Sequence, residues 1–353
     1  MTKRSCSAIS SVKCQEPPRI RGPGRLRTAV FYMTDRCVLR CSYCYFRDKG
    51  GADLPRAAAG KFLKLLEGIP GAPSGFVISG GEPLLRWKEV CWLTGEVRSR
   101  FSGRGVHLQT NGLLLDREKI GFCRKAGMTI EFGIDGDLIT TTRHRCGLDQ
   151  KSFGILVGNI REAVRAGIGV GCTMTVHPDQ VTQMASNLLF LCSLGIGHVD
   201  VTPAAFMPWD ARSAGLFRRN YQKILKVPAF RRKLLVSEDL EPLLPGTMDL
   251  SLHPPGDLLG GDAFLCLPRE KRAACSLWDS KTGQWRPELL EVLQQAYQAL
   301  HQRRGKLVYR GLISCNFQFI DALLGGKKLS RDMVPLMRFM TLEHLKQARR
   351  EGK

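Results

Sequence analysis

Short apolar runs rich in β-branched residues alternate with longer amphipathic stretches from residue 28 to about residue 227. The short runs predict strands at 28–34, 76–79, 106–109, 129–134, 169–176 and 199–203, and the longer ones predict helices at 56–66, 86–100, 116–126, 153–166, 181–194 and 211–225. Strand and helix in alternation are typical of βα units around a parallel sheet. Six units are too few for a closed eight-stranded barrel, so we expect an α/β fold with a partial (β/α)6 TIM-type barrel.

The repeat stops near residue 228, where prolines and glycines break the pattern. Two strands are predicted at 248–253 and 258–267, joined by the turn Pro254-Pro255-Gly256-Asp257, and two helices at 287–303 and 333–349. We therefore expect three parts. They are a basic flexible arm (1–27), the barrel core (28–227), and a small irregular α+β extension (228–353) with a hairpin and terminal helices.

Composition favours a cytoplasmic protein that does not enter a membrane. The 353 residues are 43% hydrophobic and contain no apolar run near the roughly 18 residues of a membrane span. The net charge of +21 is scattered in short runs, so nucleic acid is a possible but not favoured partner. Thirteen cysteines, without a recognisable secretory signal, indicate reduced thiols with a metal-binding subset.

Three of these cysteines, Cys37, Cys41 and Cys44, lie within eight residues, directly after the first predicted strand. Such thiolates can ligate one face of an iron–sulfur cubane and leave one iron without a protein ligand. The alternative is a structural zinc site, which requires a fourth ligand. His144 is the candidate for it, although it is distant in the sequence.

A second motif, Gly80-Gly81-Glu82-Pro83, follows the second predicted strand. Glycines allow a backbone to approach a ligand closely, and a carboxylate complements an ammonium group. The motif is predicted to lie at the carboxyl end of a barrel strand, where barrel enzymes place their chemistry. The two motifs should therefore share one edge of the sheet.

In spacing and order, these motifs resemble those of the radical S-adenosylmethionine (SAM) superfamily, in particular its peptide- and protein-modifying branch, over residues 28–225. The resemblance implies one [4Fe–4S] cluster on the three cysteines and SAM bound at its open iron. Reductive cleavage of SAM would give a 5′-deoxyadenosyl radical that abstracts hydrogen from a substrate.

The resemblance also assigns SAM-binding residues. It implies that Tyr43 lies beside the adenine and that the segment from Gly80 through Gly81 and Glu82 to Pro83 meets the methionyl amine. Weaker matches are Asn111 and Asp135 at the next strand ends, and Arg145, in preference to Arg143, at the methionyl carboxylate. Gly133 stands where the branch usually has serine, which changes an expected ribose contact. No catalytic acid or base can be named.

The implied partners are SAM, a peptide or protein substrate, and an electron donor such as flavodoxin or ferredoxin. Two other functions stay open: a radical SAM enzyme acting on RNA or a small metabolite, and a non-catalytic iron–sulfur or zinc module. The branch often carries auxiliary clusters in a C-terminal extension called SPASM or twitch. Here Gly261 stands at an expected ligand position and only Cys266, Cys275 and Cys315 follow, so we expect a degenerate extension without a second cluster.

Overall fold

The computed structural model describes residues 28–44, 51, 53–67, 73, 75–204 and 207–227, together with 262–265, 278–279, 284–285 and the single positions 336, 339, 340 and 343. The strands of the main sheet are β1 (Thr28–Tyr32), β2 (Gly75–Ser79), β3 (Gly105–Thr110), β4 (Thr129–Gly133), β5 (Val170–Val176), β6 (His198–Pro203) and β7 (Asp262–Leu265). All of their pairings are parallel, in the order β6-β5-β4-β3-β2-β1-β7. Among the described residues β6 and β7 are edges, so the predicted open barrel is confirmed.

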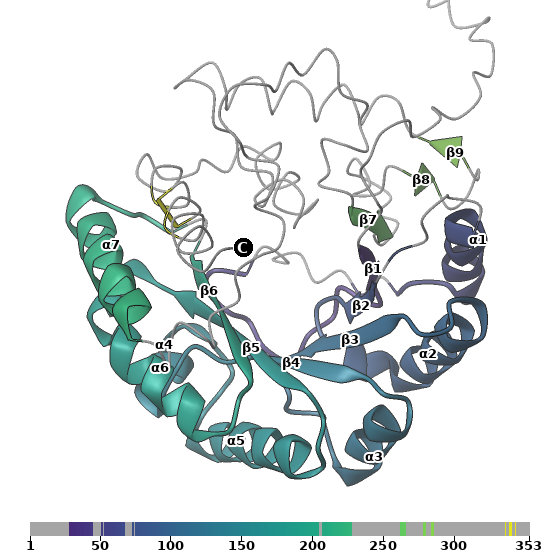
Figure 1. The fold of residues 1–353 in the computed structure, drawn as a ribbon, viewed down its shortest axis with the longest axis horizontal. Helices are drawn as coiled ribbons and strands as arrows, with labels where there is room; N and C mark the ends of the chain where they lie inside the picture. The colour runs from purple at the N-terminus through teal and green to yellow at the C-terminus, as the bar shows by residue number, and fades with distance from the viewer. Residues whose placement is uncertain are drawn as a thin grey trace, which may run out of the picture.

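The helices cover the convex side of this curved sheet (Figure 1). They are α1 (Arg56–Glu67), α2 (Trp87–Arg100), α3 (Arg117–Lys125), α4 (Leu138–His144), α5 (Gln150–Arg165), α6 (Met184–Ser193) and α7 (Ala211–Lys226), with 3-10 turns η1 (Pro83–Arg86) and η2 (Pro178–Gln183). Alternate strand residues such as Ile130 and Phe132 are buried among the helices. Their neighbours in sequence, such as Glu131, therefore face the concave side.

Capping explains one helix that the sequence did not predict and one helix start that it placed too late. The short helix α4 was not predicted. It begins where the Asp137 carboxylate accepts the Thr140 N–H, and it supplies the residues that contact the cysteine loop. Helix α5 begins at Gln150, three residues earlier than predicted, because Asp149 and Ser152 form a reciprocal capping box.

Strand β7 lies inside the predicted strand 258–267, but in the structure it pairs in parallel with β1, with Thr28 opposite Asp262. The C-terminal extension therefore adds a strand to the sheet of the core. The arm 1–27, the hairpin partner 248–253 with its turn, and the helix 287–303 lie outside the described residues.

The described positions of the predicted last helix are helical. Leu336 is fully buried, and the Phe339 ring lies 6.4 Å from that of Tyr221 in α7. A short antiparallel pair, β8 (Trp278–Asp279) with β9 (Gln284–Trp285), lies between β7 and this helix in the sequence. Of the helices described, none has the length and apolar character needed to span a membrane.

Candidate functional site

The cysteine loop leaves β1 and is attached to the end of α4 by backbone hydrogen bonds. The Arg40 N–H donates to the Cys146 carbonyl and the Ser42 N–H to the His144 carbonyl, both at 2.8 Å. Leu39, only 1% exposed, anchors the loop in the core.

Cys37, Cys41 and Cys44 all lie half-buried on this loop. Three soft sulfur donors on one short loop are the ligand set that an iron–sulfur cluster requires, so the residues present fit that group.

The glycines of the second motif pack against the segment that enters the cysteine loop. The Gly81 N–H donates to the Thr34 carbonyl at 2.7 Å and the Glu82 N–H to the Arg36 carbonyl at 2.8 Å. Gly80 has a φ of +142°, and a Cβ on it would stand 2.5 Å from the Thr34 carbonyl oxygen. The chain's own packing therefore requires glycine here, a reason that the sequence did not supply. Contact of this segment with SAM stays a prediction.

The Glu82 carboxylate joins the end of β2 to the end of β3. It is 0% exposed. Its Oε1 accepts the Leu84 N–H at 3.0 Å and the Thr110 hydroxyl at 2.7 Å, and its Oε2 accepts the Asn111 N–H at 2.8 Å. Burial raises the pKa of Glu82 to about 7, although these hydrogen bonds act in the opposite direction. Pro83, also buried, follows as the first residue of η1.

Asn111 links this carboxylate to the cysteines. Its side-chain amide donates to the Cys37 sulfur at 3.6 Å, and its Oδ1 accepts the Leu113 N–H at 3.0 Å. Its side chain is thus held in place with the amide N–H directed at a predicted cluster ligand.

A second buried group lies on the other side of the loop, around Asp135. Its Oδ2 accepts the Tyr43 hydroxyl at 2.5 Å and Arg145 Nε at 2.9 Å, while Oδ1 accepts Arg145 Nη2 at 2.7 Å and the Thr175 N–H at 2.9 Å. Burial raises the pKa of Tyr43, so the phenol stays protonated and donates. The guanidinium of Arg145 also lies 5.7 Å from the centre of the Tyr43 ring.

Arg145 also acts on the cysteine loop. Burial raises the pKa of the Cys41 thiol to about 11, and the Arg145 cation opposes this rise. Arg143, the alternative at the sequence level, instead makes an ion pair with Asp179 through Nε at 2.8 Å and is largely exposed. The buried position beside the cysteine loop therefore belongs to Arg145.

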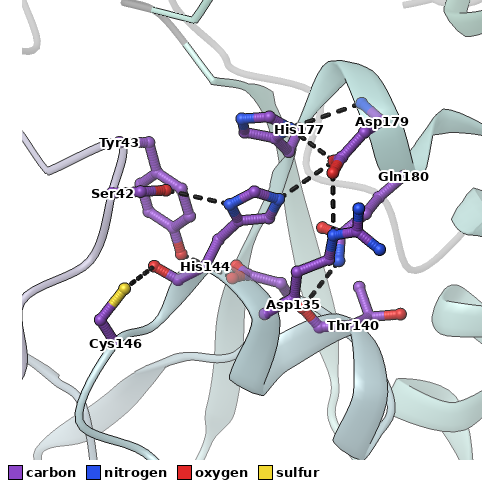
Figure 2. A network of polar contacts seen from close by, with 10 residues as sticks. Ser42, Tyr43, Asp135, Thr140, His144, Cys146, His177, Asp179 and Gln180 are labelled. Atoms are coloured by element: carbon purple, nitrogen blue, oxygen red, sulfur yellow. Dashed lines mark hydrogen bonds and ion pairs between the residues drawn. The ribbon is translucent and has the colours of Figure 1, made fainter.

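The sequence did not predict two further polar groups. On the concave face, Glu131 accepts the Thr173 hydroxyl, and burial, together with Glu131, raises the pKa of Asp200 to about 6. The alternation of polar and apolar residues in β4 and β6 is a signal that could have indicated this acidic pair. The second group brings His144, the last residue of α4, together with His177 and Asp179 at the start of η2 (Figure 2), and nothing in the spacing along the chain links His144 to the other two.

Comparison with known proteins agrees with this arrangement. Residues 31–191 match the family model of the radical SAM superfamily. The chain is 27% identical over 153 residues to Fe-coproporphyrin III synthase of Methanosarcina barkeri (43% of this chain, 37% of the relative). It is 26% identical over 198 residues to the serine-type anaerobic sulfatase-maturating enzyme of Klebsiella pneumoniae (53% and 48%). It is 30% identical over 182 residues to a GTP 3′,8-cyclase of Corynebacterium glutamicum (49% and 43%). The matched part spans less than half of each of these relatives.

Solved structures share the fold at low identity. Streptococcus suis SuiB bound to the precursor peptide SuiA aligns with a TM-score of 0.54 and 13% identity, over 84% of this chain and 71% of that one. The enzyme anSMEcpe with bound AdoMet and Kp18Cys peptide aligns with a TM-score of 0.53 and 15% identity, over 62% and 66%. The open parallel barrel, the cysteine loop after β1 and the family match all indicate the same kind of domain. Residues 31–191 therefore form a radical SAM domain.

Proposed function

We propose that Cys37, Cys41 and Cys44 hold one [4Fe–4S] cluster, that SAM binds beside it, and that the enzyme modifies a peptide or protein. When bound, the reduced cluster supplies the electron that cleaves SAM to methionine and a 5′-deoxyadenosyl radical, which takes hydrogen from the substrate. An electron donor such as flavodoxin or ferredoxin, and a cytoplasmic location, complete the proposal.

The observation that carries it is the position of the cysteine loop between two buried polar groups. Asn111 donates toward Cys37 on one side, and Arg145 lies against Tyr43 and opposes the raised pKa of Cys41 on the other. Beside this loop, burial raises the pKa of the Glu82 carboxyl to about 7, and buried carboxyls that titrate near neutral pH are common at functional sites.

The roles of the remaining residues follow from their charge. The Glu82 carboxylate, when ionised, attracts the methionyl ammonium, and the backbone of Gly80 and Gly81 lines its approach. Arg145 attracts the methionyl carboxylate while Asp135 holds its guanidinium in a fixed plane. The ring of Tyr43, fixed through its hydroxyl, offers a flat face to the adenine.

Two comparisons support a peptide or protein substrate. The sulfatase-maturating relative acts on a protein, and both structural neighbours were solved with peptides bound. A second candidate is a small metabolite, because curated relatives include a GTP 3′,8-cyclase and Fe-coproporphyrin III synthase. The two substrate classes share the site for the cluster and SAM.

The cluster and SAM chemistry are tested with anaerobically reconstituted full-length protein. With dithionite and SAM it should release 5′-deoxyadenosine. Replacing Cys37, Cys41 and Cys44 together by alanine should abolish both cluster absorbance and product. The exposed neighbour Cys146 provides a matched control, because Cys146→Ser removes a thiol beside the loop without touching the three ligands. SAM cleavage by the triple variant would refute the assignment.

The substrate class is tested by isotope transfer. A peptide encoded beside the gene, labelled with deuterium at carbon, should pass deuterium into 5′-deoxyadenosine and change in mass. Transfer from labelled GTP or a porphyrin precursor, with none from peptides, would favour the small-metabolite candidate.

A further inference from the structure

We propose that His144, His177 and Asp179 form a binding site for one Zn²⁺ ion, next to the cysteine loop and separate from its thiols. Three potential ligand atoms converge here (Figure 2). His144 Nε2 lies 3.0 Å, and His177 Nδ1 2.5 Å, from the same oxygen, Oδ1 of Asp179. Two imidazole nitrogens and one carboxylate, with room for water, are a ligand set that zinc uses in proteins.

The three ligand atoms face one another at short distance. His177 is the N-cap of η2, and its Nδ1 lies 3.4 Å from the Asp179 backbone nitrogen, a contact longer than an ordinary hydrogen bond that leaves the lone pair able to bind a metal ion. The same nitrogen faces the Asp179 carboxylate oxygen, which is also an acceptor. When His144 Nε2 and His177 Nδ1 both present lone pairs, a cation between them is attracted by the two nitrogens and by the Asp179 carboxylate.

Protonation of both histidines is a poor alternative source of that positive charge. The two rings are stacked with their centres 3.7 Å apart, at an angle of 18°. Two imidazolium ions in this position would repel each other strongly. One divalent ion satisfies all three groups without charging either ring.

The outer atoms of two ligands are already held by partners. His144 Nδ1 lies 3.0 Å from the Ser42 hydroxyl, and Asp179 Oδ2 accepts Arg143 Nε at 2.8 Å. Such outer contacts orient the ligands of a metal site and direct their free atoms inward. The Arg143 charge weakens cation binding, so we expect an affinity below that of structural zinc sites with four protein ligands.

The site would fasten the cysteine loop. The His144 carbonyl accepts the Ser42 N–H, and Ser42 lies between Cys41 and Cys44. A metal ion that joins His144 to η2 fixes this anchor. The inference does not depend on SAM chemistry, because the bound ion itself is measured.

The test uses full-length protein whose cluster has been fully reconstituted, so that the three cluster thiols are occupied. After titration with Zn²⁺ and removal of unbound metal, we expect one zinc retained per chain, and we expect His177→Ala or Asp179→Asn to remove it. X-ray absorption at the zinc edge should show only nitrogen and oxygen ligands, at about 2.0–2.1 Å. Sulfur at about 2.3 Å would place the ion on thiols and overturn the proposal.

Variants locate the ion. His177→Ala and Asp179→Asn should each weaken zinc binding by about 100-fold or more, since even outer-shell changes cost about 10–100-fold. Asp179→Asn is nearly isosteric and decides the matter if His177→Ala does not fold. Cys146→Ser, which removes the nearby exposed thiol, should leave zinc binding unchanged. Full zinc retention by Asp179→Asn, or its loss in Cys146→Ser, would overturn the assignment.

Discussion

The guanidinium of Arg145 occupies the space that a side chain on Gly133 would need. Its Nη1 lies 2.6 Å from the position of a Cβ at residue 133, closer than real Cβ atoms approach. The glycine at a position where the branch usually has serine is therefore linked to a buried arginine twelve residues away that pairs with Asp135.

Gly133→Ser should displace Arg145 and weaken the group around Asp135. We expect a loss of about 1–3 kcal/mol in the free energy of unfolding, as for other overpacked sites, together with weaker SAM binding. Chemical denaturation and equilibrium SAM binding measure the two effects.

The control for this contact is a double-mutant cycle. In an Arg145→Ala background, Gly133→Ser should cost much less than in the native chain, because the clashing group is absent. Equal costs in the two backgrounds would show that Gly133 is needed for another reason.

Glu82 should make stability depend on pH. Its folded pKa, about 7, lies above the usual 4.5, so between these values the folded state holds a proton that the unfolded state has lost. The contribution of the Glu82 carboxyl to the free energy of unfolding is therefore most favourable below pH 4.5. It decreases by about 3 kcal/mol as the pH rises towards 7. Urea denaturation of cluster-free protein across this range measures the slope, and Glu82→Gln should flatten it.

The same Glu82→Gln variant tests the predicted contact with SAM. Loss of the negative charge should weaken SAM binding by about 1–3 kcal/mol, while cluster content stays close to native. If cluster and SAM binding are lost together, Glu82 serves only to join the ends of β2 and β3.

Asn111 should tune the cluster through its hydrogen bond to Cys37. Removing an N–H donor from a ligand sulfur concentrates negative charge on the cluster, so Asn111→Ala should lower its reduction potential. A redox titration followed by electron paramagnetic resonance gives the shift. Asn159→Ala is the matched control. Its amide supports the same loop through the Gly112 and Leu115 carbonyls without touching sulfur, and the potential should stay unchanged.

Iron content tests the prediction of a single cluster. Reconstituted protein should hold about four irons per chain and the triple cysteine variant close to none. About eight irons, falling to about four in the variant, would show that Cys266, Cys275 and Cys315, which lie outside the described residues, hold a second cluster.

The sequence by itself determined the barrel and the positions of the two motifs. A strand or helix that is buried on one face has apolar residues at regular intervals in the sequence. The six strands predicted from this periodicity all appear in the sheet. Cys37, Cys41 and Cys44 are close in sequence, so their spacing alone is sufficient to predict that they bind one metal centre together. Glu82 was found in the same way, since it directly follows a strand.

Only the tertiary structure decided which distant residues meet at the site. The sequence could not show that Arg145 fills the space above Gly133, that Asn111 faces the Cys37 sulfur, or that β7 pairs in parallel with β1. The stacking of His144 on His177 is another contact that the sequence could not show. These contacts join residues on different loops and strands, and they arise when parallel strands bring their carboxyl ends to one edge. The spacing of residues along the chain shows the local periodicity of strands and helices. It does not show which loops meet at the edge formed by the carboxyl ends of the strands.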